Sequence, residues 1–163
     1  YSSIKIRIWI HSWEVIHGNV GSSQTRVDYT IIGDNVNIAS RLEGICKEYW
    51  IWICASEEVY LREKQNFYFR EIDNIRLKWK KEPVKIYELL GFKENELSQW
   101  EIIKYWIYRK WLDLYRGWKY QEAYDVWSKN VDDSASIYMS QRCSNLLSWK
   151  AFLEDWIYIM THK

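Results

Sequence analysis

Two hydrophobic periods alternate along the first half of the chain and predict a mixture of strands and helices. Apolar residues occupy every second position over residues 4–10, which is the period of a β-strand. A second short strand is predicted at 14–17, and the polar residues 18–28 are predicted to form a loop. From Val36 onward the apolar residues recur three or four positions apart, so residues 35–49 are predicted to form an amphipathic helix.

Strands and helices continue to interleave as far as residue 90. The predicted strands cover 51–54, 67–72, 74–79 and 84–90, and a short helix opened by Ser56 covers 57–64. Interleaving of this kind favours a domain built on a sheet, of the α/β or α+β class.

The chain changes character near residues 91–96, after which helical spacing prevails. The helices are expected at 97–117, 120–127 and 134–147. A helix pair with tyrosine, alanine and other aromatic residues at these offsets resembles one tetratricopeptide unit. We therefore expect two parts, a sheet domain over 1–91 and a helical extension over 92–163.

Composition and charge argue against several classes of function. The 23 Lys and Arg residues nearly balance the 22 Asp and Glu residues, so neither a dedicated nucleic-acid surface nor a polybasic membrane anchor is expected. No apolar run approaches the roughly 18 residues that span a bilayer, and no membrane contact by this segment is expected. Cys46, Cys54 and Cys143 lack the spacing of zinc ligands or of a redox pair, so they are interpreted as reduced thiols of a cytoplasmic chain.

The candidate chemistry lies in residues 28–44, DYTIIGDNVNIASRLEG. A strand leads from Thr30 into a glycine turn, and the predicted helix carries Asn37 and Arg41 four positions apart, on one face. A guanidinium suits a phosphate, and an amide offers both a donor and an acceptor for a sugar. The spacing alone is equally compatible with the solvated polar face of an amphipathic helix.

This stretch and its flanks, IRIWIHSWEVIHGNVGS and REIDNIRLKWKKEPVKIYELLG, resemble the class III nucleotidyl cyclase catalytic domain of the bacterial adenylate cyclase kind. The resemblance covers roughly residues 4–91. It implies the C-terminal half of an α+β, ferredoxin-like cyclase domain. The tail resembles the extension that follows some bacterial cyclase domains, and we expect it to be an all-α helical hairpin. Because the chain begins with Tyr1 and lacks the first half of such a domain, we expect it to be a fragment.

The resemblance implies roles for four residues. Asn37 and Arg41 match the pair that orients the ribose and stabilises the α-phosphate in the transition state. Lys78 matches the lysine that holds the triphosphate. Thr30 stands at the position that reads the adenine base, where its hydroxyl can donate and accept. The implied reaction is attack of the ribose 3′-hydroxyl of ATP on the α-phosphate, which yields 3′,5′-cyclic AMP and pyrophosphate.

The resemblance also implies what this chain does not supply. The two aspartates that bind Mg²⁺ (or Mn²⁺) in the family lie upstream, and Asp34 is expected to cap the helix rather than bind a metal. The family's sites form between two catalytic domains, so a homodimer is expected and the fragment alone is expected to be inactive. A cytoplasmic location is expected, compatible with a membrane-anchored parent protein that has an N-terminal sensor.

Two alternatives stay open. The first is a catalytically inactive cyclase-like module that only dimerises or regulates. The second is a guanylate cyclase, although Thr30 does not favour GTP. Upstream sequence with aspartates at the metal positions would favour the enzyme over the inactive module.

Tryptophan is unusually frequent in this chain and glycine unusually rare, at 12 and 6 residues. We hypothesise that the gene reads UGA as glycine and that these codons are translated here as tryptophan. Trp127 instead fits a core aromatic residue. Glycine is expected in the family at Trp9, Trp13, Trp79 and Trp156, and Trp50 and Trp118 occupy turn positions.

Overall fold

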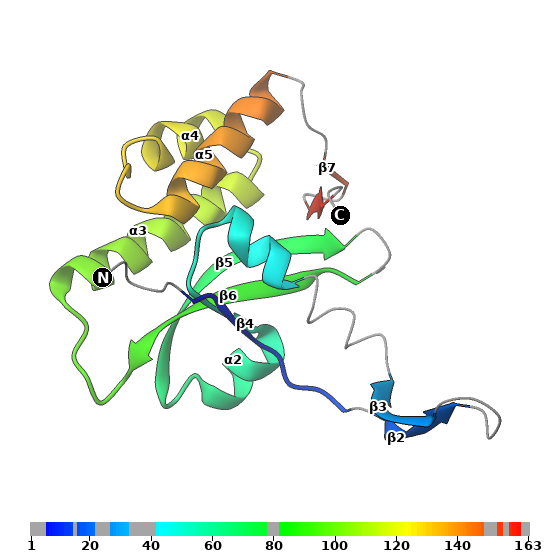
Figure 1. Ribbon diagram of the computed structural model, residues 1–163. Helices are drawn as coiled ribbons and strands as arrows, with labels where there is room; N and C mark the ends of the chain where they lie inside the picture. Colours follow the sequence, from blue (N-terminus) through cyan, green and yellow to red (C-terminus); the bar gives the residue numbers. More distant parts are fainter. Residues whose placement is uncertain are drawn as a thin grey trace, which may run out of the picture.

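The computed structural model describes residues 6–14, 16–21, 27–32, 42–77, 82–148, 153–154 and 157–160. Within these residues the chain forms a six-stranded sheet of order β1-β4-β6-β5-β8-β7 (Figure 1). Its strands are β1 Ile8–Ile10, β4 Ile53–Ser56, β5 Phe67–Leu77, β6 Val84–Phe92, β7 Leu153–Glu154 and β8 Ile157–Met160. The antiparallel hairpin of β2 Ile16–Gly21 and β3 Val27–Ile32 lies apart from this sheet (Figure 1).

The helices cover the two faces of the sheet unequally. They are residues 42–48, α2 Glu57–Glu63, α3 Gln99–Arg116, α4 Tyr120–Trp127 and α5 Ser134–Leu147. Residues 42–48 and α3 to α5 share one large hydrophobic core with Cys54 and Ile86 of the sheet. The neighbouring residues Ala55 and Tyr87 point to the other face and pack under α2, because successive side chains of a strand alternate between faces. In the described part of the chain, no helix is long and apolar enough to span a membrane.

The strands differ from their predicted positions because pairing, rather than local pattern, decides where a strand ends. Part of the predicted loop 18–28 is paired in the hairpin, with Gly18 opposite Thr30 and Gly21 opposite Val27, so the loop prediction is wrong there. The predicted strands 67–72 and 74–79 are one strand, β5, as far as Leu77, and residues 78 and 79 lie outside the described residues. The register of β5 against β6 shifts between Glu71 and Asp73. That shift is a β-bulge, which breaks the alternation that the sequence pattern follows.

The three helices of the tail agree with the prediction. Ser98 and Glu101 form a capping box at the start of α3, and Gly117 ends this helix, while the bounds of α5 match the predicted range 134–147. The expectation of an all-α tail is wrong for the end of the chain, where β8 pairs in parallel with β5 of the sheet. Periodicity over two to four residues is too short to identify such strands.

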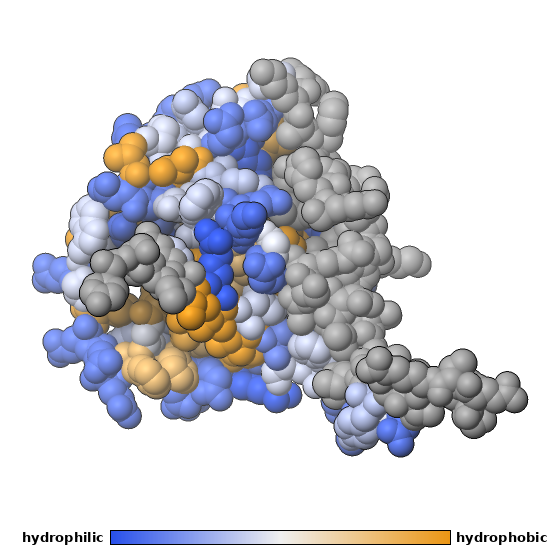
Figure 2. Space-filling model, in the orientation of Figure 1, coloured by the Kyte–Doolittle hydropathy of each residue, from blue (hydrophilic) through white to orange (hydrophobic). Residues whose placement is uncertain are grey.

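One edge of the sheet is β1, which pairs in parallel with β4. Figure 2 shows hydrophobic surface over β1 near the middle of the displayed face, where Ile8 and Ile10 are exposed. The strand predicted at 4–10 is confirmed at 8–10 and is wrong at residues 6 and 7, which precede β1, whereas residues 4 and 5 lie outside the described residues.

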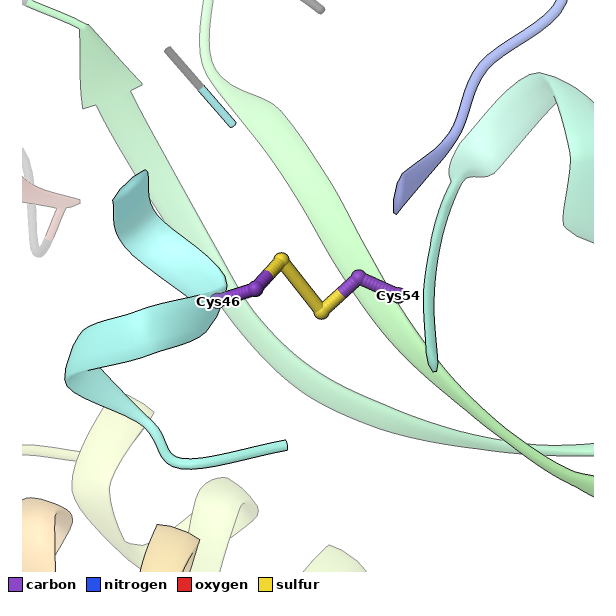
Figure 3. The surroundings of a disulfide bond; sticks show 2 residues. All are labelled: Cys46 and Cys54. Carbon is purple, nitrogen blue, oxygen red and sulfur yellow. A yellow bond between two sulfur atoms is a disulfide. The ribbon is translucent and has the colours of Figure 1, made fainter. Parts of the chain in front are cut away.

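A disulfide joins Cys46, in the helix of residues 42–48, to Cys54 in β4 (Figure 3). The expectation of three reduced thiols is therefore wrong for this pair, and Cys143 is the free, buried cysteine. The Cα atoms of the pair are 6.4 Å apart, within the range that a disulfide bridges. Packing of a helix on a strand creates this proximity, which the spacing in the sequence does not reveal.

Candidate functional site: the support of the predicted catalytic helix

The structure describes one of the four predicted site residues, and only through its backbone. Thr30 lies in β3, paired with Gly18 of β2. Asn37, Arg41 and Lys78 lie outside the described residues, as does Asp34. The roles of these residues therefore stay predictions.

Two of these residues adjoin described elements in the sequence. Arg41 immediately precedes Leu42, the first described residue of the helix, and Lys78 follows Leu77, the last residue of β5. The described chain therefore shows what holds the helix and the strand that adjoin Arg41 and Lys78 in the sequence.

The segment Gly18-Asn-Val-Gly21 does not form a turn. It continues β2 up to its last residue, Gly21. Next to it, the ring nitrogen Nδ1 of His17 lies 2.5 Å from Tyr29 Oη across the hairpin. This pair braces the strand that carries Thr30.

The helix of residues 42–48 is fixed to the sheet by an almost completely buried apolar face. Leu42, Ile45, Cys46 and Tyr49 lie three or four positions apart and are all buried in the main core. This confirms the amphipathic pattern predicted for 35–49 over its described part. Because a buried leucine or isoleucine contributes roughly 1.5–3 kcal/mol, the helix is held firmly against the sheet.

A buried polar cluster lies where this helix ends. Arg142 of α5 donates through Nη1 to Asp73 Oδ2 of β5 and through Nη2 to the Tyr49 hydroxyl. The Tyr49 hydroxyl in turn donates to Asp73 Oδ2 at 2.5 Å. Arg142 is only 3% exposed, and it joins an element of the tail to both the helix and the sheet.

The charge states in this cluster follow from its surroundings. Burial raises the pKa of Tyr49 well above its usual value, and Asp73 adds to this effect although Arg142 opposes it. For Arg142, burial favours loss of the proton, but the surrounding groups, Asp73 among them, outweigh this and raise its pKa. Arg142 is therefore a charged guanidinium, and Tyr49 is a neutral phenol that donates its proton in a hydrogen bond to Asp73.

A second contact from α5 reaches the same end of the helix. The Tyr138 hydroxyl donates to Glu48 Oε2 at 2.7 Å, and the rings of Tyr138 and Tyr49 lie 4.6 Å apart. The Arg142 guanidinium lies within 5.5 Å of both ring centroids, which is the range of a cation–π interaction. One helix of the tail therefore holds the predicted catalytic helix through two successive residues.

A separate buried cluster joins the start of α5 to the sheet. Arg70 of β5 donates to Glu88 Oε2 of β6 at 2.5 Å and to Asp133 Oδ1 at 3.0 Å. Asp133 also caps α5 by accepting from the Ser136 backbone amide. Burial raises the pKa of Glu88, whereas in Asp133 the effect of burial is outweighed by Arg70 and Ser136, which lower its pKa.

The bulge in β5 explains why both clusters face the tail. Arg70 and Asp73 are three positions apart, an odd separation that would place them on opposite faces of a regular strand. The register shift between Glu71 and Asp73 pairs Arg70 with Glu88 and Asp73 with Ile86, which lie on the same face of β6. Both charged side chains therefore point toward α5.

Sequence reasoning did not identify Asp73, Arg142 or Tyr49 as site residues. A signal was present, since Arg142 lies between the buried residues Met139 and Cys143 on the apolar side of α5. A charged residue at an apolar position indicates a buried partner. The identity of that partner, 69 residues away, could not be read from the pattern.

The described residues offer no metal site. No group of three or more His, Cys, Asp or Glu side chains that could hold an ion occurs among them. The donor set required for Mg²⁺ is therefore not provided by this part of the chain, and the upstream position of the metal ligands stays a prediction.

Comparison with known proteins places this chain among cyclases. Residues 1–91 match the family described as the adenylate and guanylate cyclase catalytic domain. The chain is 32% identical over 151 residues to the terminal-differentiation specific adenylate cyclase of Dictyostelium discoideum, covering 88% of this chain and 7% of that protein. It is 42% identical over 89 residues to an adenylate cyclase of Anabaena cylindrica, covering 53% of this chain and 18% of that protein.

Among solved structures, the adenylyl cyclase CyaB from P. aeruginosa is similar with 33% identity and a TM-score of 0.41, covering 51% of this chain and 41% of that one. The chain thus spans less than a fifth of the length of the two curated relatives. The match with the Dictyostelium protein, at 151 residues, is longer than the 91 residues that match the family and therefore includes part of the helical tail. The chain belongs to the family of the adenylate and guanylate cyclase catalytic domain.

Proposed function

We propose that this chain forms part of an adenylate cyclase, in which it supplies the base-reading and transition-state residues. The observation that carries the proposal is the 42% identity to the Anabaena cylindrica adenylate cyclase over 89 residues, a length comparable to the 91 residues of the domain match. The motif that holds Thr30, Asn37 and Arg41 lies inside residues 1–91, which match the family.

Each residue has a role that suits its chemistry. Arg41 offers a planar guanidinium to the α-phosphate as the ribose 3′-hydroxyl attacks and pyrophosphate leaves. This charge develops in the transition state, so the interaction lowers the barrier rather than only tightening substrate binding. Asn37 orients the ribose, Thr30 reads the base, and Lys78 holds the triphosphate.

The complete active site requires two catalytic domains in this proposal. One domain contributes the residues of this chain, and a second copy contributes the upstream aspartates that hold the metal ions. The partners are therefore ATP and a second copy of the protein.

The test is cyclic nucleotide production by the parent protein that contains this chain, supplied with ATP or GTP. We expect cyclic AMP from ATP, and we expect the variant Asn37→Ala/Arg41→Ala to lose about 10²-fold or more of this activity. The matched control is Asn95→Ala/Arg109→Ala, which removes the same two residue types from exposed positions and should retain activity.

Three results would contradict the proposal. Normal output from the Asn37→Ala/Arg41→Ala variant would remove these residues from the mechanism. Faster turnover of GTP than of ATP would identify a guanylate cyclase. A dimer that turns over neither nucleotide would identify the regulatory module.

A further inference from the structure

We propose that Arg142 is a positioning residue for the predicted catalytic helix, which makes the helical tail a working part of the cyclase. This inference depends on the proposed function, because the helix concerned carries Asn37 and Arg41 in its predicted first turns. Arg142 acts on the end of the helix at residues 48 and 49, through the Tyr49 hydroxyl.

The geometry at that end leaves the helix little freedom. Arg142 donates to the Tyr49 hydroxyl, and both groups share the carboxylate of Asp73 in β5. Tyr138 adds a hydrogen bond to Glu48 one residue earlier. A rotation of the helix about its axis, or a shift along it, would break both contacts together.

Stability alone does not explain a buried arginine at this position. Burying an ion pair costs desolvation that its attraction only partly offsets, and apolar residues of similar size often stabilise a fold as well or better. What an ion pair with fixed hydrogen bonds adds is a defined orientation. A displacement of about 1 Å in a catalytic group can cost about 10²-fold in rate, so an orienting contact at the end of the helix has a direct catalytic benefit.

The matched pair of variants is Tyr49→Phe and Tyr108→Phe. Both tyrosines are fully buried, and each loses only its hydroxyl. The Tyr49 hydroxyl joins Arg142 and Asp73 to the helix, whereas the Tyr108 hydroxyl joins α3 to the Ile72 carbonyl of β5 at 3.0 Å. The direct variant, Arg142→Met, leaves Asp73 buried without its ion-pair partner and is the less safe choice for folding. Tyr49→Phe keeps the Arg142–Asp73 ion pair, and this variant should therefore fold.

Two readouts test the proposal. In hydrogen exchange on this chain, the amides of residues 42–48 should exchange roughly tenfold faster in Tyr49→Phe than in Tyr108→Phe. In the parent protein, Tyr49→Phe should lower kcat roughly tenfold with KM for ATP changed less than twofold, and Tyr108→Phe should leave kcat near the wild-type value when measured well below its unfolding temperature.

Equal amide exchange rates for residues 42–48 in Tyr49→Phe and Tyr108→Phe would overturn the proposal. Equal kcat values for these two variants would also overturn it. If the parent protein shows no cyclase activity, the proposed function falls, and the exchange rates then decide alone whether Arg142 holds this helix.

An independent observation concerns the tryptophans. Among the described residues other than glycine, those with a positive φ angle are Trp50, at 56°, and Trp118, at 62°. Both follow the end of a helix, and both have the hydrogen bonds of a Schellman motif. Ile51 N donates to Cys46 O while Trp50 N donates to Lys47 O, and Lys119 N donates to Leu114 O while Trp118 N donates to Tyr115 O.

The residue in left-handed conformation in this motif is usually glycine, because a Cβ atom there is strained. The indoles do not compensate by burial, since Trp50 is 61% and Trp118 is 60% exposed. We infer that glycine is the natural residue at positions 50 and 118, encoded by UGA codons that are translated here as tryptophan.

The codons and the natural protein decide this inference. UGA at positions 50 and 118, with glycine in the corresponding peptides of protein isolated from its own cells, is the expected result. UGG is expected at position 127, because Trp127 is fully buried in the core. UGG at position 50 or 118, or tryptophan in those natural peptides, would overturn the inference.

Discussion

Replacing Trp118 by glycine, although it removes the largest side chain, is expected to leave the chain more stable than replacing it by alanine. Both substitutions remove the indole and its contact with Tyr120, whose ring centroid lies 6.0 Å away. They differ only in the Cβ atom, which alanine keeps in a backbone with φ of 62°. Comparing the two variants therefore isolates the strain of the left-handed conformation from the loss of the aromatic contact.

The magnitude follows from two opposing contributions. A Cβ atom in the left-handed region costs roughly 1–2 kcal/mol, and glycine loses about 0.4–1 kcal/mol more conformational freedom on folding. The glycine variant should thus exceed the alanine variant by roughly 0.5–1 kcal/mol in free energy of unfolding. The same sign is expected at Trp50, where either substitution also removes the cation–π contact with Arg7, 5.3 Å from the ring centroid.

At Trp127 the alanine variant should instead be more stable than the glycine variant. Trp127 is the last residue of α4 and is fully buried. There both substitutions should destabilise by about 3–5 kcal/mol, and glycine should be worse than alanine because of its low helix propensity. Urea unfolding of the six variants, followed by far-ultraviolet circular dichroism, measures each difference. Alanine variants as stable as the glycine variants at both Trp50 and Trp118 would refute the strain argument.

The cysteines and an acid titration supply two more predictions. In the native protein Ellman's reagent should react with no thiol, because Cys46 and Cys54 form a disulfide and burial raises the pKa of Cys143 to about 12. After unfolding without a reductant, one thiol per chain should react, and three reactive thiols would contradict the disulfide. The pKa of Asp133 is lowered in the folded chain, because Arg70 and Ser136 outweigh the effect of its burial. Its carboxylate therefore stabilises the fold fully above the unfolded pKa of about 3.9. This contribution is lost as the pH falls through the lowered pKa of the folded state. Asp133→Asn should therefore show a shallower fall in the free energy of unfolding below about pH 4, and equal slopes in the two proteins would contradict this assignment.

Local signals predicted the helical elements of the tail well. Apolar spacing predicted a helix that ends near Gly117, and α3 ends at Arg116, because its ends are held by contacts within one turn, such as the capping box of Ser98 and Glu101. The strands were predicted less well, because a strand is stabilised by a partner that is distant in the sequence. The pairing of Gly18 with Thr30 shows this, since the residues around Gly18 have the composition of a loop.

The sequence by itself determined the cyclase family and the turn positions of Trp50 and Trp118, because motifs and helix ends are encoded by residues close together in the chain. The roles of Thr30, Asn37, Arg41 and Lys78 stay predictions. Only the tertiary structure decided how the tail is joined to the predicted catalytic helix. Arg142 meets Tyr49 across 93 residues and Asp73 across 69. Contacts across such separations leave no local pattern in the sequence. The β-bulge that turns the Asp73 side chain to the face of the sheet on which α5 lies forms only when β5 pairs with β6.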